Sequence, residues 1–318
     1  MTVKQAEILL AAVISARATS FLFSKILLTE MAPFAILGVR FLIAFALMAL
    51  LFHKHLRKLS RKGLVHGIIV GVLFFATMAF ELQALVYTAS GTVSLFENLA
   101  IVMVPLVVAI MSSKLPSKNV TVALVLAMGG VACFSLGNVS FSSSAGIFGI
   151  GEILAFCAAL CYTASIVTTA HVSKSDDALG LGIVQIGTMG VLGAVFSFFF
   201  ESTTPALDVS GIACLAALII ICTGFGFTLQ PVAQRYLSAE RAGLFCAITP
   251  LVASILGIVF LGETVTWASI AGIVLIVSSI FVANLDFDAV SHKRLERPIQ
   301  TNQSASFFTL HKFPRTRS

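Results

Sequence analysis

Three basic side chains, Arg17, Lys25 and Arg40, lie inside apolar stretches of the first 40 residues. An ionisable group in the hydrocarbon core costs about 2.5–3.5 kcal/mol on insertion scales, so it usually faces a cavity or a partner. Arg17 is about 12 residues from the outer end of its apolar stretch, roughly 18 Å along a helix and near the middle of a ~30 Å core. Because arginine stays protonated, Arg17 is predicted to bind a substrate carboxylate or phosphate. An internal ion pair is the alternative.

Further polar side chains could line the same cavity. Lys25 follows Arg17 by eight residues on nearly the same helical face, and is a second candidate for substrate binding. Its alternative is snorkelling to the headgroups. Gln185 and Tyr162 are candidates for the cavity lining, and each could equally make one helix–helix hydrogen bond.

Carboxyl groups in the apolar stretches offer a route for protons. Glu97 is the candidate proton carrier, because a carboxyl group in a cavity can take up and release a proton. A structural pair with Lys25 or Arg40 is equally open. Glu81 and Glu152 are expected to form ion pairs or pack between helices near the interface.

The composition requires many membrane-spanning elements around these groups. The chain has 318 residues, 58% apolar and 11% charged, whereas a soluble domain has about 25% charged residues. A spanning helix needs about 20 apolar residues, so there is room for roughly nine or ten. Soluble enzymes, nucleic-acid binders and secreted disulfide scaffolds are excluded. The six cysteines all lie in apolar runs. The sequence contains no phosphate-binding loop and no metal-binding motif, so no metal or cofactor is expected.

Long apolar runs predict an all-α integral membrane protein with ten transmembrane helices. Seventeen of the 20 lysines and arginines fall at the two ends or in alternate loops, so the positive-inside rule places both termini in the cytoplasm of a multi-pass cell-membrane protein. The basic tail, 286–318, is expected to be cytoplasmic and disordered. The predicted spans are 6–29, 33–53, 64–86, 91–112, 119–137, 147–170, 179–200, 209–229, 239–261 and 266–285.

An internal repeat divides these spans into two sets of five. Residues 105–110 (PLVVAI) align with 250–255 (PLVASI) at an offset of 145, and 80–83 (FELQ) align with 227–230 (FTLQ) after a two-residue slip. An odd number of spans inverts the second repeat, as in many secondary transporters. The predicted repeats are 6–137 and 147–285. Pro105 and Pro250 occupy matching places and are expected to kink paired gating helices.

The chain resembles the drug/metabolite transporter superfamily, in the ten-helix branch built from two EamA domains. The resemblance covers roughly residues 6–285 and rests on Phe21-x-x-x-Lys25, on 38–41 (GVRF), on 151–155 (GEILA) and on the stretch from Pro250 to 261–263 (LGE). It implies a proton- or exchange-coupled carrier of small metabolites, often an exporter, in a bacterial inner membrane. It also implies a helix-packing role for Arg40.

The favoured function is therefore a secondary-active exporter of an amino acid or related organic ion, working by alternating access between the two repeats. A lipid-linked or nucleotide-sugar translocator and a non-transporting scaffold are the alternatives. An intramembrane enzyme using Glu97, Glu81 or His66 is a third reading, which we do not favour. The expected partners are a small-molecule substrate, the bilayer and, as one candidate coupling ion, protons, but no nucleic acid. Direction and oligomeric state stay open.

Overall fold

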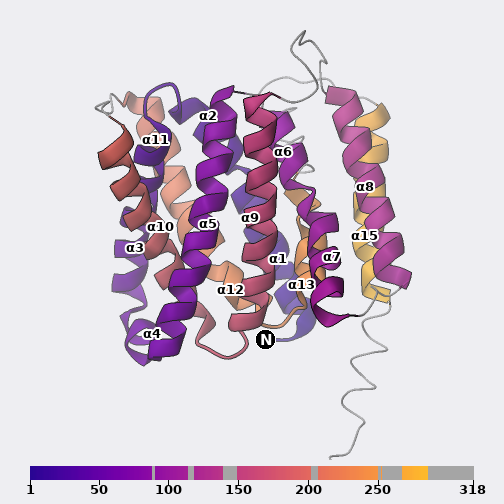
Figure 1. Ribbon diagram of the computed structural model, residues 1–318, viewed down its shortest axis with the longest axis horizontal. Coiled ribbons are helices and arrows are strands. Elements are labelled where there is room, and N and C mark those ends of the chain that lie inside the picture. Colours follow the sequence, from indigo (N-terminus) through magenta and orange to yellow (C-terminus); the bar gives the residue numbers. More distant parts are fainter. Residues whose placement is uncertain are drawn as a thin grey trace, which may run out of the picture.

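The computed structural model describes residues 1–87, 90–113, 118–138, 149–201, 207–249, 252 and 267–285, which form an upright helical bundle (Figure 1). Among the described residues, six helical stretches are long and apolar enough to span a membrane: Val3–Leu27, Pro33–Leu51, Arg61–Tyr87, Ile150–Val172, Ala178–Phe200 and Val209–Gln234. Some of these stretches are composed of consecutive segments. Shorter apolar helices cover Ala100–Ser112, Val120–Gly130 and Ile270–Ser279. The chain is thus an all-α multi-pass membrane protein.

The described elements follow the predicted order of spans. They are α1 (Val3–Ala18), α2 (Ser20–Leu27), α3 (Pro33–Leu51), α4 (His53–Lys58), α5 (Arg61–Tyr87), α6 (Ser90–Glu97), α7 (Ala100–Ser112), α8 (Lys118–Asn138), α9 (Ile150–Val172), α10 (Ala178–Phe200), α11 (Val209–Ala217), the π-helix η1 (Leu218–Phe227), α12 (Thr228–Gln234), α13 (Ala239–Phe245) and α15 (Trp267–Leu285). Most of the predicted span 239–261 beyond residue 249, together with the tail 286–318, lies outside the described residues.

Three spans predicted as continuous are divided: 6–29 and 91–112 are each built from two helices, and 209–229 runs through α11, η1 and the start of α12. The first, 6–29, is interrupted at Thr19, whose hydroxyl donates to the carbonyl of Ala16 across 2.8 Å. The fourth, 91–112, is interrupted at Asn98 and Leu99, where the Leu99 amide donates to the Phe96 carbonyl in a tightened turn. Side-chain bonds to backbone carbonyls compete with helical bonds. Hydropathy does not register such breaks, because the residues on both sides remain apolar.

Four long helices pack side by side in the order α3, α10, α5, α9. Glycines bring their backbones together: a Cβ added to Gly193 would lie 2.6 Å from the amide nitrogen of Gly38, and one added to Gly190 would lie 2.7 Å from that of Leu42. On the α5 side, a Cβ at Gly71 would lie 2.8 Å from the Gln185 carbonyl oxygen. Such close approach is typical of small residues at membrane helix interfaces. We call α3, α10, α5 and α9 the four-helix layer.

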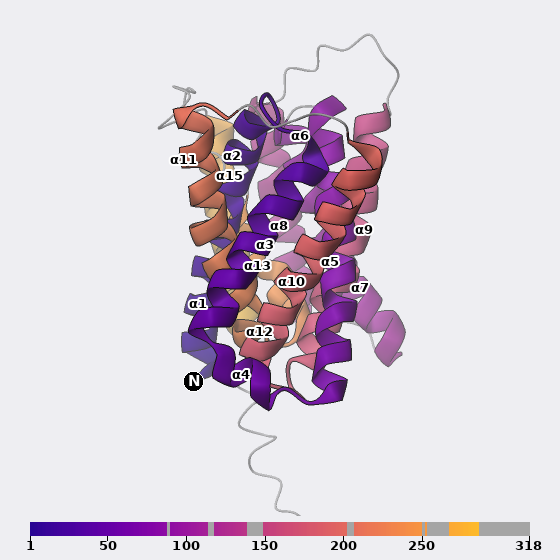
Figure 2. The same ribbon diagram turned by 90° about the vertical axis from the view of Figure 1, so that its left-hand side faces the viewer.

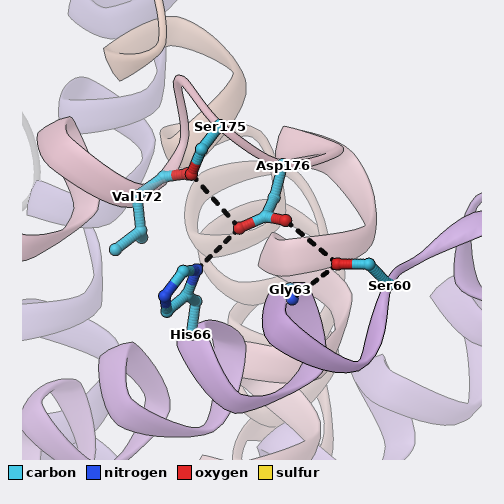
Figure 3. Close-up of polar contacts among 6 residues, drawn as sticks. All are labelled: Ser60, Gly63, His66, Val172, Ser175 and Asp176. Atoms are coloured by element: carbon cyan, nitrogen blue, oxygen red, sulfur yellow. Dashed lines mark hydrogen bonds and ion pairs between the residues drawn. The ribbon is translucent and has the colours of Figure 1, made fainter.

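Polar contacts fasten the four-helix layer at the end of the molecule that carries the N-terminus and α4 (Figures 1 and 2). His66 Nδ1 lies 2.7 Å from Asp176 Oδ2, and His55 Nδ1 lies 2.8 Å from Asp177 Oδ2. Figure 3 shows Asp176 between His66 and the hydroxyls of Ser60 and Ser175. These two pairs, named the His–Asp staple below, join α4 and α5 to the connection between α9 and α10.

Asp177 also begins α10, because its carboxylate accepts from the amides of Leu179 and Gly180 at the helix N-terminus. Burial raises the pKa of Asp177, but the hydrogen bond with His55 and those with the two amides lower it, and the resulting pKa lies below the ordinary aspartate value. The charged form of Asp177 therefore stabilises this end of the layer.

At the opposite end, Glu201 follows α10 and fastens the start of α3. Its two carboxylate oxygens accept from the amides of Phe34 and Ala35 across 2.7 and 2.8 Å. A carboxylate at a helix N-terminus satisfies otherwise unpaired amides and complements the helix dipole. The contact between α3 and α10 is consequently held at both ends and closely packed between them.

Candidate functional site

A small buried cavity lies where α1 gives way to α2. It is lined by Ile14, Arg17, Ala18, Ser20, Phe21, Met78, Glu81, Glu97, Tyr162 and Thr249, which come from α1, α2, α5, α6, α9 and the residues after α13. About 10 Å³ of it is open to the centre of a water molecule, roughly the space that one water requires. The cavity is therefore narrow in this conformation, and all ten of its lining residues are buried.

Arg17 forms the centre of the lining and is only 7% exposed. Its Nη1 donates to the Gln230 side-chain oxygen across 2.8 Å and to the Tyr162 hydroxyl across 3.1 Å. Its guanidinium carbon lies 4.2 Å from the centre of the Phe227 ring and 5.4 Å from that of Phe74. Cation–π contacts in a desolvated site are worth about 2 kcal/mol or more. Aromatic rings and neutral hydrogen-bond acceptors thus surround a permanent positive charge.

Glu81 and Glu97 bring two carboxyl groups to the same cavity. Both side chains are buried, and both interact electrostatically with Arg17. Within the described part of the chain, neither forms an ion pair with Arg17, and Oε2 of Glu81 has no hydrogen-bond partner. An uncompensated buried carboxylate is costly, so these groups must bind a proton or a cation when water is excluded. The cavity combines one fixed cation with two groups that can exchange protons.

Several helices are irregular at the level of this cavity. Arg17 ends α1, Glu97 ends α6, Phe227 ends the π-helix η1, and Thr249 follows α13. After α13 the amides of Cys246 and Ala247 donate to carbonyls three residues earlier, as in a tightened turn. Irregular backbone at membrane depth is tolerated where it is buried in protein or lines a cavity, and interrupted helices are typical of substrate sites in secondary transporters. The arrangement is suited to binding a small polar solute.

The structure brings only some of the predicted site residues together. Arg17, Tyr162, Glu97 and Glu81 line the cavity, whereas Lys25 and Gln185 are not in its lining. Lys25 donates to the Leu85 carbonyl across 2.6 Å, and Gln185 is buried with both side-chain atoms unpartnered among the described residues.

Of the residues predicted for ion pairs, packing or gating, Glu81 lines the cavity, whereas the others that the structure describes lie elsewhere. Arg40 is fully buried, donates from Nε to Thr223 across 2.9 Å and packs over Phe41. Glu152 accepts from the Gly149 amide at the start of α9. Pro105 lies inside α7, while Pro250 is outside the described residues. Among the residues that the structure describes, no group of three or more His, Cys, Asp or Glu side chains is arranged to hold a metal ion.

Gln230, Phe227 and Phe74 were missed by the sequence analysis as partners of Arg17. Gln230 and Phe227 are uncharged, so a search for intramembrane charges passes over them. A signal was nevertheless present, because both lie in the stretch 227–230 that repeats the pattern of 80–83. In the first copy of this pattern the second residue is Glu81, which also lines the cavity.

Comparison with known proteins identifies a family whose model matches most of the chain. The model of the EamA-like transporter family matches residues 5–136 and 149–285. An uncharacterized transporter of Archaeoglobus fulgidus is 25% identical over 267 residues, covering 84% of this chain and 82% of its own length. The uncharacterized transporter YcxC of Bacillus subtilis is 27% identical over 294 residues, with 88% and 91% covered.

A solved structure described only as the crystal structure of a protein shares the fold. It superposes with a TM-score of 0.72 at 19% identity, covering 92% of this chain and 99% of that one. At this identity the likeness concerns the fold alone.

Proposed function

Because the chain belongs to the EamA-like transporter family, we propose that the Arg17 cavity is the substrate site of a secondary-active membrane carrier. The substrate is a small organic metabolite, such as an amino acid or a related organic ion, and the net direction is export. The observation that carries the proposal is the meeting of Arg17, Glu81 and Glu97 where α1, α6 and α13 are interrupted. Interrupted helices beside buried ionisable groups are typical of carriers.

The cavity groups have distinct roles in this proposal. Arg17 attracts the negatively charged end of the substrate, and Tyr162 holds the guanidinium through its hydroxyl. Glu97 carries the coupling proton, and Glu81, without a partner on Oε2, is a second place for a proton or for the amino group of the substrate. Exchange of substrate for protons would leave the buried charge of the cavity compensated in both states.

Alternating access requires the cavity to open to each side in turn. We propose that the segments 6–137 and 147–285 are inverted repeats and that both termini are cytoplasmic, as the distribution of basic residues predicts. On this orientation the end with α4 and the His–Asp staple faces the cytoplasm (Figure 1).

Ligand-dependent melting in detergent tests the proposal. The panel contains amino acids, organic anions, quaternary amines and nucleotide-sugars, each at two pH values. A ligand at about 100 times its Kd adds about 2.7 kcal/mol of apparent stability. One class should stabilise the wild type but neither Arg17→Lys nor Arg17→Ala.

The matched control is Arg57→Ala, which removes an exposed arginine of α4 that is not part of the cavity lining. This variant should still be stabilised by the ligand. Equal stabilisation of wild type and Arg17→Lys by the same ligand would show that Arg17 does not contact substrate. Stabilisation by nucleotide-sugars alone would favour the translocator of larger substrates instead.

A further inference from the structure

Along α1 and α2 the cavity lining extends from Ile14 to Phe21, and it includes no residue of α1 before Ile14. The earlier residues of α1 lead to the end of the molecule that carries the N-terminus and α4, which we call the N-terminal side (Figure 1). Leu10 and Val13, which precede Ile14 in α1, are fully buried. Leu244 and Phe245 of α13 are buried as well and belong to the same apolar cluster as Leu10 and Ile14. A solute in the cavity is thus separated from the N-terminal end of the molecule by packed apolar side chains.

An ion pair between α1 and α13 lies on this side of the apolar packing. Nη1 of Arg241, in α13, donates to Oε1 of Glu7, in α1, across 3.0 Å. The side chains are only 11% and 17% exposed. Glu7 precedes Arg17 by ten residues, or about 15 Å along a helix. Ser238 caps α13 by accepting from the Arg241 amide, which fixes the start of this short helix beside α1.

The two helices joined by this pair differ from those joined by the His–Asp staple. α1 ends at Ala18, in the cavity lining, and α13 ends at Phe245, four residues before Thr249 of the lining, so both helices are interrupted at the level of the cavity. In the four-helix layer, in contrast, α10 is held to α3 and to α5 by close glycine contacts with their backbones, and Glu201 joins α10 to α3 at the far end. Packed glycine interfaces of this kind cannot separate slightly without losing many contacts together.

From these contacts, and on the premise of the carrier function, we propose that Glu7 and Arg241 form the gate of the Arg17 cavity on the N-terminal side. In the closed state the pair holds α13 against α1 over the apolar side chains. When the cavity opens to this side, α1 and α13 separate, the pair breaks and both charges become hydrated. The His–Asp staple at the same end stays intact, because it belongs to the layer that does not move.

The chemistry of the pair suits a reversible gate. Removing one partner of this partly buried ion pair takes away the attraction between α1 and α13 in the closed state, whereas in the open state water solvates both charges and nothing is lost. Loss of either residue must therefore shift the equilibrium toward the open state. Reversing the two charges restores the attraction and must restore closure.

Accessibility of a thiol placed in the cavity tests the gate without knowledge of the substrate. Ser20→Cys puts the reporter in the cavity lining. A small, charged, membrane-impermeant methanethiosulfonate is added to inside-out or right-side-out membrane vesicles. Modification of the peptide that contains position 20 is quantified by mass spectrometry, which separates it from the six native cysteines.

We expect labelling from the N-terminal side to rise on the order of tenfold in Glu7→Gln and in Arg241→Gln. The double variant should be no faster than either single variant, and the reversed pair Glu7→Arg with Arg241→Glu should return toward the wild-type rate. The matched control is His66→Ala, which breaks the nearby His–Asp staple and should lower Tm while leaving labelling unchanged. Each variant is first shown to be monodisperse, and the reversed pair still tests the gate if a single variant does not fold.

Failure of the gate and failure of the carrier give different results. If position 20 is labelled from both sides in the wild type, and Glu7→Gln, Arg241→Gln and the reversed pair all keep the wild-type rates, the gate is wrong and the carrier stands. If His66→Ala raises labelling as much as Glu7→Gln does, the moving seam includes the four-helix layer and the gate assignment is also wrong. If position 20 reacts from one side only in every variant, alternating access itself is contradicted.

Discussion

Nη1 of Arg17 donates to the hydroxyl of Tyr162 across 3.1 Å, although 145 residues separate them in the chain. The same offset aligns Pro105 with Pro250 in the proposed internal repeat. Arg17 lies in the first proposed repeat, 6–137, and Tyr162 lies in the second, 147–285. The bond therefore supports the proposal that the cavity lies at the contact between the repeats.

The partners of Arg17 should contribute measurably to stability. Tyr162→Phe removes one hydrogen bond and keeps the ring under the guanidinium, so we expect a loss of about 1 kcal/mol. Gln230→Leu removes the shorter of the two hydrogen bonds of Nη1, 2.8 Å against 3.1 Å, and puts an apolar side chain beside the buried guanidinium, so we expect a larger loss of about 1–3 kcal/mol. Unfolding in mixed micelles measures both. A smaller effect for Gln230→Leu than for Tyr162→Phe would contradict the assigned order of the two bonds.

Glu97 should carry a proton that can be followed spectroscopically. Its carboxyl lies in the cavity without an ion pair to Arg17 in the described part of the chain, so the group must protonate or bind a cation there. Glu97→Gln should remove a carboxylic-acid C=O band from the infrared difference spectrum recorded during a pH titration. Glu152→Gln, at the start of α9, is the control and should keep that band. An unchanged band in Glu97→Gln would assign the proton elsewhere, with Glu81 as the next carboxyl to test.

The glycine contact between α3 and α10 should be sensitive to a single methyl group. Gly193→Ala places a Cβ 2.6 Å from the backbone nitrogen of Gly38, and overpacking of this kind costs about 1–3 kcal/mol. Gly129→Ala in α8 is the control, since its Cβ would lie 3.7 Å from the nearest atom of Leu275. There the gain in helix propensity should leave Tm equal to or above that of the wild type. Equal Tm values for the two variants would contradict the close contact.

The stability that Asp177 gives to the end of the molecule with the N-terminus and α4 should depend on pH. Its folded-state pKa lies below the ordinary value, so the stabilisation by its charged form is present above an unfolded-state pKa of about 4 and is lost as pH falls through the folded pKa. Asp177→Asn keeps a residue that can cap α10 but has no charge. The Tm difference between wild type and Asp177→Asn should shrink as pH falls below about pH 4. A difference that grows in acid would reverse the sign of this argument.

The sequence alone determined that the protein lies in a lipid bilayer, and it located most of the long helices. Apolar runs that include 33–53, 64–86 and 179–200 correspond to α3, α5 and α10, because burial in lipid requires long uninterrupted apolar stretches, which composition reveals directly. Arg17 was likewise found from the sequence, since a charge in such a run is rare and costly. The family followed from short motifs spread over both halves of the chain.

Only the tertiary structure decided which of these groups meet. Lys25 shares a helical face with Arg17, yet α2 begins after a break at Thr19 and Lys25 reaches the Leu85 carbonyl instead. Glu81 enters the cavity, and Glu7 pairs with Arg241 across 234 residues of chain. Such meetings depend on the rotation of each helix and on breaks set by single side-chain hydrogen bonds. Hydropathy averages over helix rotation and over such breaks. The sequence therefore identified the charged residues inside the membrane, whereas helix packing determined their partners.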